Sequence, residues 1–231
     1  MTEGGGSFFG RRKGKRLRLG QRQALEAVVP ALLIDTHNRP SAGGLSALFP
    51  VPVDDVRLEI GIGSGEHLLA EARLRPRGGF IGVEPFENGL AKAAVAIRTD
   101  AIPNVRLYDQ DAVLLLDWLP SAALTRVDLL FPDPWPKKRH WKRRFVNAAN
   151  LDRIARCLSG DGIFRFATDV ADYAEWTREA VAQCAALELI ESEAARELWA
   201  DWPGTRYQTK AEAQGRGAIR LAFRRIARDG A

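Results

Sequence analysis

The sequence has few cysteines, no histidine cluster and no long apolar run. Its 231 residues include two cysteines, Cys157 and Cys184, which lie in apolar helical patterns and form no Cys-x-x-Cys pair. Because no metal-ligand spacing is present, we expect buried free thiols of a reducing cytoplasm and no metal cofactor. No apolar run approaches the roughly 20 residues that span a bilayer, and no apolar segment follows the basic N-terminal stretch as in a secretory signal. These absences predict a cytoplasmic protein that does not enter a membrane.

Positive charge is scarce outside two segments. The net charge is +5, but residues 1–23 hold seven Lys or Arg against Glu3, which gives +6 and leaves −1 for the remainder of the chain. Residues 1–20 are also Gly-rich and aperiodic, which predicts a flexible basic arm. The second cationic segment follows Asp133 and contains Lys137, Lys138, Arg139, Lys142, Arg143 and Arg144. Two basic segments on a nearly neutral chain favour contact with nucleic-acid phosphates over a merely solvated tail.

From Val56 onward, short β-branched or apolar runs alternate with amphipathic segments of helical length. This alternation predicts an α/β fold, a doubly wound and mostly parallel seven-stranded sheet with helices on both faces, in a single domain of residues 21–231. The expected strands are Val56–Gly61, Phe80–Glu84, Val105–Asp109, Val127–Phe131, Ile163–Thr168, Leu187–Glu191 and Ile219–Arg224. The expected helices are Gln21–Val28, Glu66–Arg75, Glu87–Asp100, Val113–Leu119, Arg143–Leu158 and Ala171–Ala186. Such sheets bind ligands at the carboxyl ends of their strands, so the residues that close the strands form the candidate site.

The stretch "LEIGIGSGEHLL" leads from the first expected strand into a helix through Gly61, Gly63 and Gly65. Glycines allow a sharp turn and a close approach of a ligand to the backbone. NAD-dependent oxidoreductases carry a Gly-rich turn at the same place, so they remain an alternative. The spacing here is G-x-G-x-G, however, without the last glycine of G-x-G-x-x-G. In addition, Glu59 stands where it would repel a pyrophosphate and attract a cation.

Three successive strands close with acids or are followed by one: Glu59, Glu84 and Asp111. S-adenosylmethionine suits this arrangement, because it has no phosphate and carries an ammonium and a sulfonium group. We expect Glu84 to accept hydrogen bonds from both ribose hydroxyls, Asp111 to accept one from the adenine amino group, and Glu59 to face the methionine part. For any one of these acids the alternative is a helix-capping role.

The fourth strand ends in "DPWP", which begins at Asp133 and directly precedes the second cationic segment. Prolines on both sides of a residue stiffen a loop, so they hold the carboxylate of Asp133 in one place. Methyltransferases that act on base nitrogens often carry a related Asp/Asn-Pro-Pro-aromatic segment here. Trp135 either fills the core beneath the loop or stacks on a base. His140 is expected to be neutral among these cations, and His67 shows no partner in the sequence.

Several stretches together resemble one family. "LEIGIGSG", "GVEPFENG", "FPDPWPKKRHWKRR", "FATDVADYAEW" and "TRYQTKAEAQGRG" are similar to segments of the tRNA (guanine-N7-)-methyltransferases, over roughly Val56 to the end of the chain. The resemblance implies a Rossmann-like class I methyltransferase that transfers a methyl group from S-adenosylmethionine to N7 of a guanosine in the tRNA variable loop. It implies tRNA as the partner and leaves the oligomeric state open between a monomer and a homodimer.

The resemblance also assigns residues. The motifs match cofactor or catalytic positions at Glu59, Glu84, Asp111 and Asp133, with the cofactor turn formed by Gly61, Gly63 and Gly65. They match substrate-binding positions at Lys137, Asp169, Thr205, Arg206, Tyr207 and Gln208. Gln208 stands where the family usually has Glu, which preserves an acceptor but not a charge. Trp141 occupies a place that is more often polar, so this part of the cationic segment stacks or packs.

The chemistry of guanine agrees with these residue types. N7 carries a lone pair and no proton, so its methylation requires positioning and electrostatics rather than a strong base. We expect Asp133 to be the catalytic residue, which accepts the guanine N1 and N2 hydrogens while positive charge develops on the purine. The alternatives are methylation of another guanine atom or of another RNA, an NAD-dependent oxidoreductase, and a non-catalytic RNA-binding subunit. Glu59 and the missing third glycine argue against the oxidoreductase, and the presence of all four acids argues against the non-catalytic subunit.

Overall fold

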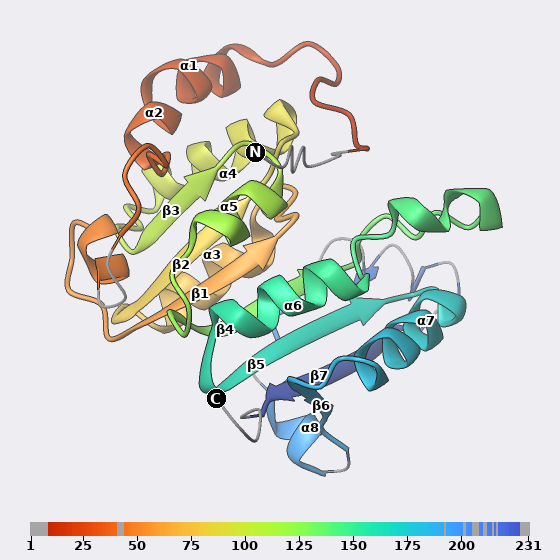
Figure 1. Cartoon of the computed structure of the whole chain (residues 1–231). Helices are drawn as coiled ribbons and strands as arrows, with labels where there is room; N and C mark the ends of the chain where they lie inside the picture. Colours follow the sequence, from red (N-terminus) through yellow and green to blue (C-terminus); the bar gives the residue numbers. More distant parts are fainter. Residues whose placement is uncertain are drawn as a thin grey trace.

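The computed structural model describes residues 9–40, 44–191, 193–200, 202–204, 208–209, 212–213, 215 and 217–226. Its strands are β1 (Asp55–Ile60), β2 (Gly78–Val83), β3 (Val105–Tyr108), β4 (Leu124–Leu130), β5 (Leu158–Thr168), β6 (Leu187–Leu189) and β7 (Ile219–Arg225). They form one sheet in the order β3-β2-β1-β4-β5-β7-β6 (Figure 1). β7 runs antiparallel to β5 and β6, and the other neighbouring strands are parallel. This mostly parallel, seven-stranded sheet confirms the predicted fold class.

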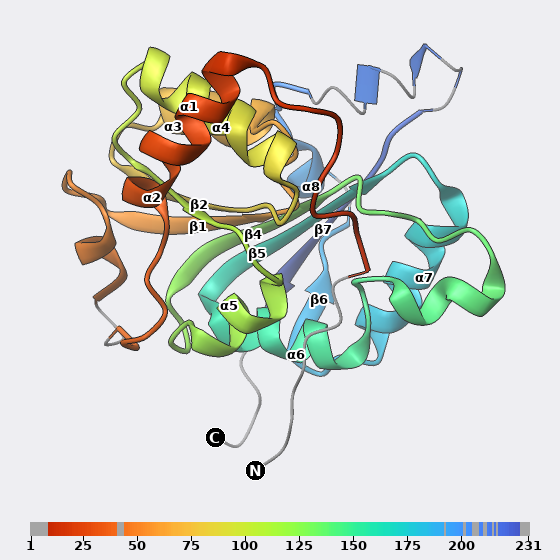
Figure 2. The same cartoon turned by 90° about the horizontal axis from the view of Figure 1, so that it is seen from above.

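Helices cover both faces of the sheet (Figure 2). One face carries α1 (Leu19–Ala27), α2 (Val29–Leu32), α3 (Glu66–Leu74) and α4 (Glu87–Thr99). The other face carries α5 (Ala112–Trp118), α6 (Ala148–Cys157) and α7 (Ala171–Ala182). A short helix, α8 (Glu193–Glu197), follows β6, and a 3-10 turn, η1 (Gly44–Leu48), precedes β1. Each layer closes over its own apolar cluster, one around Leu68 and Leu90 and the other around Val127 and Phe164.

The strand order changes direction between β1 and β4. From β1 the chain winds outward through β2 and β3, and it then returns to the other side of β1 to form β4 and β5. In doubly wound sheets the connections on the two sides of such a point diverge and leave a crevice at the carboxyl ends of the strands. The sequence segments that follow β1 and β4, which hold the glycine turn and Asp133, therefore meet at this crevice.

The described part of the basic arm, residues 9–18, runs along the start of α4. The Glu87 N–H donates to the Arg12 carbonyl at 2.9 Å, and the Gly14 N–H donates to Asn88 Oδ1 at 2.8 Å. The arm thereby forms one wall of a cavity of about 280 Å³ next to the ends of β2 and β3. The flexibility that the sequence predicts for the arm stays a prediction.

The prediction was wrong about where the helix after the fourth strand begins. The sequence pattern placed it at Arg143–Leu158, whereas α6 begins at Ala148. A 3-10 turn, η2 (Lys138–Arg143), comes first, and Asn147 then caps α6 by accepting a hydrogen bond from the Asn150 N–H at 3.1 Å. The cationic segment is therefore not the first turn of α6 but a separate projection from the sheet (Figure 1).

Most other predicted boundaries agree with the structure within a few residues, but β5 begins at Leu158 rather than Ile163. Cys157 and Cys184 are buried and free, as predicted. In the described ranges, the structure contains no helix with the length and apolar character needed to cross a membrane. Within the same ranges, no group of three or more His, Cys, Asp or Glu could hold a metal ion.

Candidate functional site

The glycine turn connects β1 to α3 at the centre of the sheet. Gly61, Gly63 and Gly65 have φ angles of 77°, 57° and 82°, in the left-handed region that favours glycine. The Gly61 and Ile62 N–H groups donate to the Val83 carbonyl at 2.9 and 3.1 Å, which ties the turn to β2. A Cβ on Gly61 would meet no atom within 4 Å, so the backbone is open there. The three predicted glycines thus form a turn at the carboxyl ends of β1 and β2 that is open at Gly61, whereas Gly65 is buried.

Glu84 closes β2 and lies directly against the glycine turn. Its Oε2 accepts a hydrogen bond from the Gly63 N–H at 2.6 Å, and its Oε1 accepts one from the Phe86 N–H at 2.9 Å. The pKa of Glu84 is raised to about 7, mainly by burial and in addition by the charges of Asp133 and Glu59, against the lowering effect of the two backbone donors. Within the described chain no cation pairs with this carboxylate. It is therefore suited to accept hydrogen bonds from neutral hydroxyl groups.

The other two predicted cofactor acids lie on the strands that flank β2. Glu59 is in β1, is 4% exposed, and accepts a hydrogen bond on Oε2 from His67 Nδ1 at 2.6 Å. Asp111 follows β3 and caps α5, because its Oδ1 accepts from the Val113 N–H at 2.9 Å. The capping alternative therefore applies to one oxygen of Asp111, and the other oxygen accepts no hydrogen bond from the described residues.

Asp133 lies in an exposed loop after β4 whose backbone is held on both sides. The Phe131 N–H donates to a β5 carbonyl at 2.7 Å, and the Pro134 carbonyl accepts from Arg144 Nε at 3.0 Å. Phe131 and Trp135 have φ angles of 49° and 45°. Such conformations cost on the order of 1–3 kcal/mol each and persist where the surroundings fix the backbone, often at functional sites. The Asp133 carboxylate makes no hydrogen bond or ion pair with the described residues, so it is available to a ligand.

Arg144 corrects the prediction that the whole cationic segment binds phosphates. Its side chain is 1% exposed, and its guanidinium lies 4.7 to 5.3 Å from the ring centroids of Trp141, Tyr173 and Trp176. Its Nη2 donates to Asp172 at 2.5 Å. Together with the bond from Nε to the Pro134 carbonyl, these contacts make Arg144 a support of the loop that holds Asp133 rather than a phosphate ligand. Trp141 packs, which is one of the two roles its sequence position allowed.

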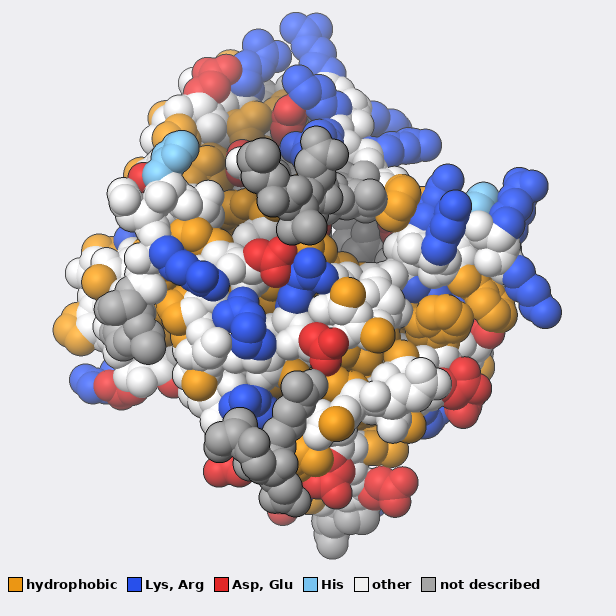
Figure 3. Space-filling model, in the orientation of Figure 1, with side chains coloured by type: hydrophobic (Ala, Val, Ile, Leu, Met, Phe, Trp, Pro, Cys, Tyr) orange, Lys and Arg blue, Asp and Glu red, His pale blue; other side chains and the backbone are white. Residues whose placement is uncertain are grey.

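The exposed cations of the segment gather on the projection formed by η2, at the right of Figure 3. They are Lys137, Lys138, Arg139 and Lys142, and none of them forms an ion pair with a described acid. Arg143 instead lies between the rings of Trp135 and Phe9, at 4.9 and 5.3 Å. The pKa of His140 is lowered by desolvation and by the surrounding cations, in agreement with a neutral imidazole. The surface that can meet phosphates is therefore narrower than the sequence predicted.

The structure describes three members of the predicted substrate set, Lys137, Asp169 and Gln208, whereas Thr205, Arg206 and Tyr207 lie outside the described residues. Asp169 directly follows β5, the strand beside β4, so it lies at the same edge of the sheet as the loop that holds Asp133. Gln208 Oε1 accepts hydrogen bonds from Trp202 Nε1 at 2.5 Å and Arg220 Nη2 at 3.1 Å. The oxygen that Gln shares with Glu is thus in use as an acceptor.

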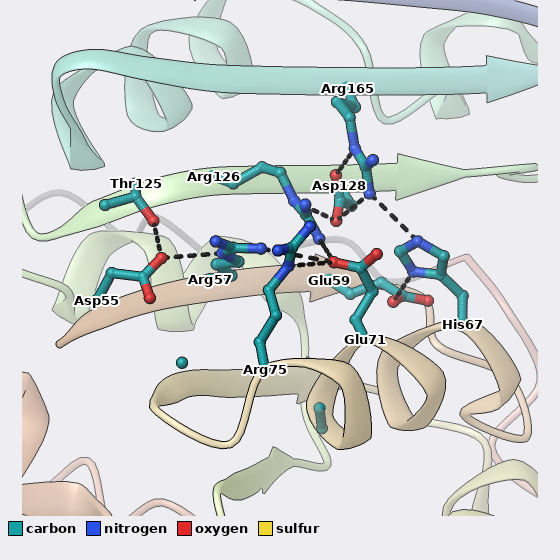
Figure 4. A network of polar contacts seen from close by, with 12 residues as sticks. Asp55, Arg57, Glu59, His67, Glu71, Arg75, Thr125, Arg126, Asp128 and Arg165 are labelled. Carbon is teal, nitrogen blue, oxygen red and sulfur yellow. Dashed lines mark hydrogen bonds and ion pairs between the residues drawn. The ribbon is translucent and has the colours of Figure 1, made fainter. Parts of the chain in front are cut away.

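A row of buried charged side chains lies behind the glycine turn (Figure 4). Strand pairing places Glu59 of β1 beside Asp128 of β4, and Asp128 beside Arg165 of β5. Arg165 donates to both oxygens of Asp128, at 2.6 and 3.0 Å, and Arg126 bridges Asp128 at 3.0 Å and Glu71 of α3 at 2.6 Å. Burial opposes the ionisation of both acids, but the arginines outweigh it and lower the pKa of Asp128 and of Glu71.

His67 belongs to this network, which corrects the expectation that it has no partner. Its Nδ1 lies 2.6 Å from Glu59 Oε2, and its Nε2 lies 3.2 Å from Arg165 Nη2. Its ring lies against the indole of Trp202, with 4.7 Å between the centroids. The network therefore connects the cofactor turn to the segment that precedes Gln208.

Alternating charges in the strands are the sequence signal that could have revealed this network. "VRLEI" carries Arg57 and Glu59 two positions apart, and "TRVDLL" carries Arg126 and Asp128 in the same way. Residues two apart in a strand share one face. Charges on a face that a helix covers need partners, so this pattern could have been used to predict ion pairs beneath α3.

Known proteins resemble this chain in sequence. The model of a family described as "Putative methyltransferase" matches residues 54–221. The tRNA (guanine-N(7)-)-methyltransferase of Chelativorans sp. is 53% identical over 222 residues, which cover 95% of both chains. The proteins of that name from Azorhizobium caulinodans and Rhizobium meliloti are 52% and 51% identical and cover 97% of this chain, and 97% and 100% of their own.

Solved structures resemble it in fold. The 16S rRNA methyltransferase KamB has a TM-score of 0.54 at 16% identity and covers 76% of this chain and 89% of its own. The antibiotic-resistance methyltransferase Kmr has a TM-score of 0.54 at 18% identity, with coverages of 82% and 94%. Identities this low show only the shared class I methyltransferase fold. The relatives that are about 50% identical show the family as well as the fold, because they match nearly the whole chain. The chain belongs to the family of tRNA (guanine-N(7)-)-methyltransferases.

Proposed function

We propose that this protein transfers the methyl group of S-adenosylmethionine to N7 of a guanosine in the variable loop of tRNA. The observation that carries the proposal is the convergence of four acids, at the carboxyl ends of four adjacent strands, on an open glycine turn. In the order of the strands β3-β2-β1-β4, these acids are Asp111, Glu84, Glu59 and Asp133. The names of the relatives supply the reaction and the substrate, and this convergence supplies a site for both.

The charges of the site fit S-adenosylmethionine. Carboxylates already repel one another there, since the charges of Asp133 and Glu59 raise the pKa of Glu84. The phosphates of NAD would add negative charge, whereas an ammonium and a sulfonium group relieve the repulsion. Glu84 would accept the ribose hydroxyls, the unengaged oxygen of Asp111 the adenine amino group, and Glu59 would face the ammonium. The acids thus favour a methyl donor over the dinucleotide of an oxidoreductase.

S-adenosylmethionine supplies an electrophilic methyl group when it is bound. The task of the protein is to hold the guanine with N7 in line and to favour the positive charge that methylation places on the purine. Asp133 performs both parts, because its free carboxylate can accept the N1 and N2 hydrogens that distinguish guanine from adenine. Its loop is fixed by Phe131 and Arg144, so the carboxylate needs little reorganisation as charge develops. N7 bears no proton, and no side chain has to act as a base.

The tRNA backbone would lie on the exposed cations of η2, which continue directly from the catalytic loop. Phosphate contacts fix the position of an RNA without reading its sequence, so the shape of the tRNA selects the substrate. Asp169 follows β5 at the same edge of the sheet, and Gln208 is hydrogen-bonded to Arg220 of the neighbouring β7, so both would contact the nucleotides near the target base.

Substitution of the target atom tests the proposed function. Labelled S-adenosylmethionine is given with a tRNA that carries guanosine, or else 7-deazaguanosine, at the variable-loop position. 7-Deazaguanine keeps N1, N2 and O6 but has a C–H group in place of N7, so it should bind and accept no methyl group. Equal labelling of both tRNAs would place the methyl group on another atom and would refute the proposal.

The raised pKa of Glu84 predicts that binding of the ribose releases protons. Ionised Glu84 is the better acceptor for hydroxyl groups, so the affinity for 5′-methylthioadenosine, which has the ribose but no amine or carboxylate, should rise with pH through about 7. About half a proton should be released at pH 7, and nearly one at pH 6. Titration calorimetry in buffers of different ionisation enthalpy measures this number. Glu84→Gln should abolish the release, and a binding heat that is the same in all buffers would contradict the prediction.

The cations of η2 predict a salt-dependent affinity for tRNA. Each phosphate contact contributes roughly 0.7–0.9 to the slope of log affinity against log salt. The double substitution Lys138→Ala with Lys142→Ala should therefore lower the slope by about 1.5 in filter-binding titrations. Arg73→Ala with Arg98→Ala, in the last turns of α3 and α4, removes the same charge at the opposite edge of the sheet and should leave the slope unchanged. Equal effects of the two pairs would show that only net charge matters.

A further inference from the structure

The carboxylate of Glu59 has one oxygen engaged and one open. Oε2 accepts the hydrogen bond from His67, and Oε1 accepts none from the described part of the chain. Glu59 is 4% exposed and His67 is 2% exposed, so water competes little for the bond between them. A carboxylate rotates about its last bond unless a partner holds it. His67 therefore fixes the orientation of the Glu59 carboxylate and leaves Oε1 available to a ligand.

The contacts of His67 fix its tautomer. A guanidinium group has only donors, so the contact between Arg165 Nη2 and His67 Nε2 at 3.2 Å requires Nε2 to be the acceptor. The proton of the neutral ring then lies on Nδ1, which donates to Glu59 at 2.6 Å. Asp128 holds Arg165 in place through two hydrogen bonds. Arg165 thus donates to Asp128 on one side and to His67 on the other, and His67 donates onward to Glu59.

Packing holds the imidazole ring as firmly as its hydrogen bonds do. His67 is the second residue of α3, and the indole of Trp202 covers its ring at an interplanar angle of 37°. The guanidinium of Arg165 lies 4.7 Å from the ring of Trp199 and donates from Nη1 to the Leu198 carbonyl at 2.9 Å. Leu198, Trp199 and Trp202 thus cover the two members of the His67–Arg165 pair.

We propose that His67 is a positioning residue for cofactor binding, which fixes Glu59 so that its open oxygen meets the ammonium group of S-adenosylmethionine. The inference rests on the proposed role of Glu59 at the methionine end of the cofactor. His67 itself touches no part of the reacting groups. Its effect should be confined to ligands that carry the ammonium, and the adenosine part should bind independently of it.

Two ligands separate this role from a general structural one. S-adenosylhomocysteine has the ammonium group, whereas 5′-methylthioadenosine has the same adenosine and a thioether without it. In calorimetry on the full chain, Glu59→Gln should weaken S-adenosylhomocysteine binding about 10- to 100-fold and leave methylthioadenosine binding within about twofold. His67→Phe keeps a ring against Trp202 but has no donor, and it should show the same selectivity with a loss of about tenfold.

His67→Asn is the rescue variant. Its amide nitrogen can take the place of Nδ1, so it should restore S-adenosylhomocysteine binding to within about threefold of the unchanged protein. Selective loss in both His67→Phe and Glu59→Gln, with rescue by His67→Asn, supports the inference. Selective loss in Glu59→Gln alone, or equal loss of both ligands in His67→Phe, overturns it. A lack of selectivity in Glu59→Gln refutes instead the role of Glu59 on which the inference rests.

Discussion

Replacing Asp133 by alanine should lower the turnover number about 100- to 1,000-fold, the usual effect of removing one group that stabilises charge in a transition state. The carboxylate has no structural partner among the described residues, so its loss should not disturb the loop, which Phe131 and Arg144 hold through backbone atoms. Single-turnover methyl transfer to a tRNA transcript measures the chemical step. Calorimetry with S-adenosylhomocysteine should give a dissociation constant within about threefold of the unchanged protein.

Two further variants separate charge from shape at this position. Asp133→Asn keeps one acceptor and loses the charge, so its turnover number should lie between those of the aspartate and alanine forms. Asp161→Ala removes an exposed acid at the amino-terminal end of β5 and should have no effect. An unchanged turnover number in Asp133→Ala would remove Asp133 from the mechanism.

Replacing Asp128 by alanine should lower the free energy of unfolding by about 3–5 kcal/mol, the usual cost of breaking a buried ion pair from one side. Asp128 is 2% exposed and accepts hydrogen bonds from both Arg126 and Arg165. Without Asp128, the guanidinium groups of Arg126 and Arg165 lose their shared counter-ion. Arg126 keeps its ion pair with Glu71. Urea unfolding followed by fluorescence, extrapolated to zero denaturant, measures the change.

A surface ion pair provides the matched control. Asp100→Ala removes an acid of the same type, whose partner Arg73 is well exposed, and exposed pairs contribute only about 0–1 kcal/mol. If Asp128→Ala lowered the free energy of unfolding no more than Asp100→Ala does, the buried ion pairs of Figure 4 would not stabilise the fold more than an exposed pair.

Much of the fold could be predicted because it depends on local patterns. The strands β1, β2 and β3 follow from apolar runs, and their order follows from the way a doubly wound sheet is built. The start of α6 could not be predicted from apolar periodicity, because the helical pattern of the sequence continues back into the 3-10 turn. The turn ends before Arg144, because the guanidinium of Arg144 packs against Tyr173 and Trp176 of α7, which lie far along the chain.

The positions of the candidate cofactor acids could also be predicted from the sequence. Glu59, Glu84 and Asp111 stand at or next to strand ends, and parallel neighbouring strands bring their ends together without any further information. The role of Asp133 depended more on the resemblance to a family, because a proline-flanked acid has several uses. The structure adds that its loop is strained and held from both sides, which no local pattern states.

Arg144 and His67 show what the sequence could not provide. Arg143 and Arg144 are adjacent and chemically identical, yet one lies between the rings of Trp135 and Phe9 and the other is enclosed by the rings of α7 and η2. The choice between them is made by tertiary packing. His67 in turn acquires its partners from β1 and β5, which are remote from it in the chain.

The most direct test of the account is to locate the methyl group on the product tRNA. An unmodified transcript is methylated with S-adenosylmethionine and then treated with borohydride and aniline, which break the chain at N7-methylguanosine. Methylation of N7 in the variable loop predicts one new break, in that loop, which disappears when the guanosine is replaced by adenosine. Methyl incorporation without a break, or a break elsewhere in the tRNA, would contradict it.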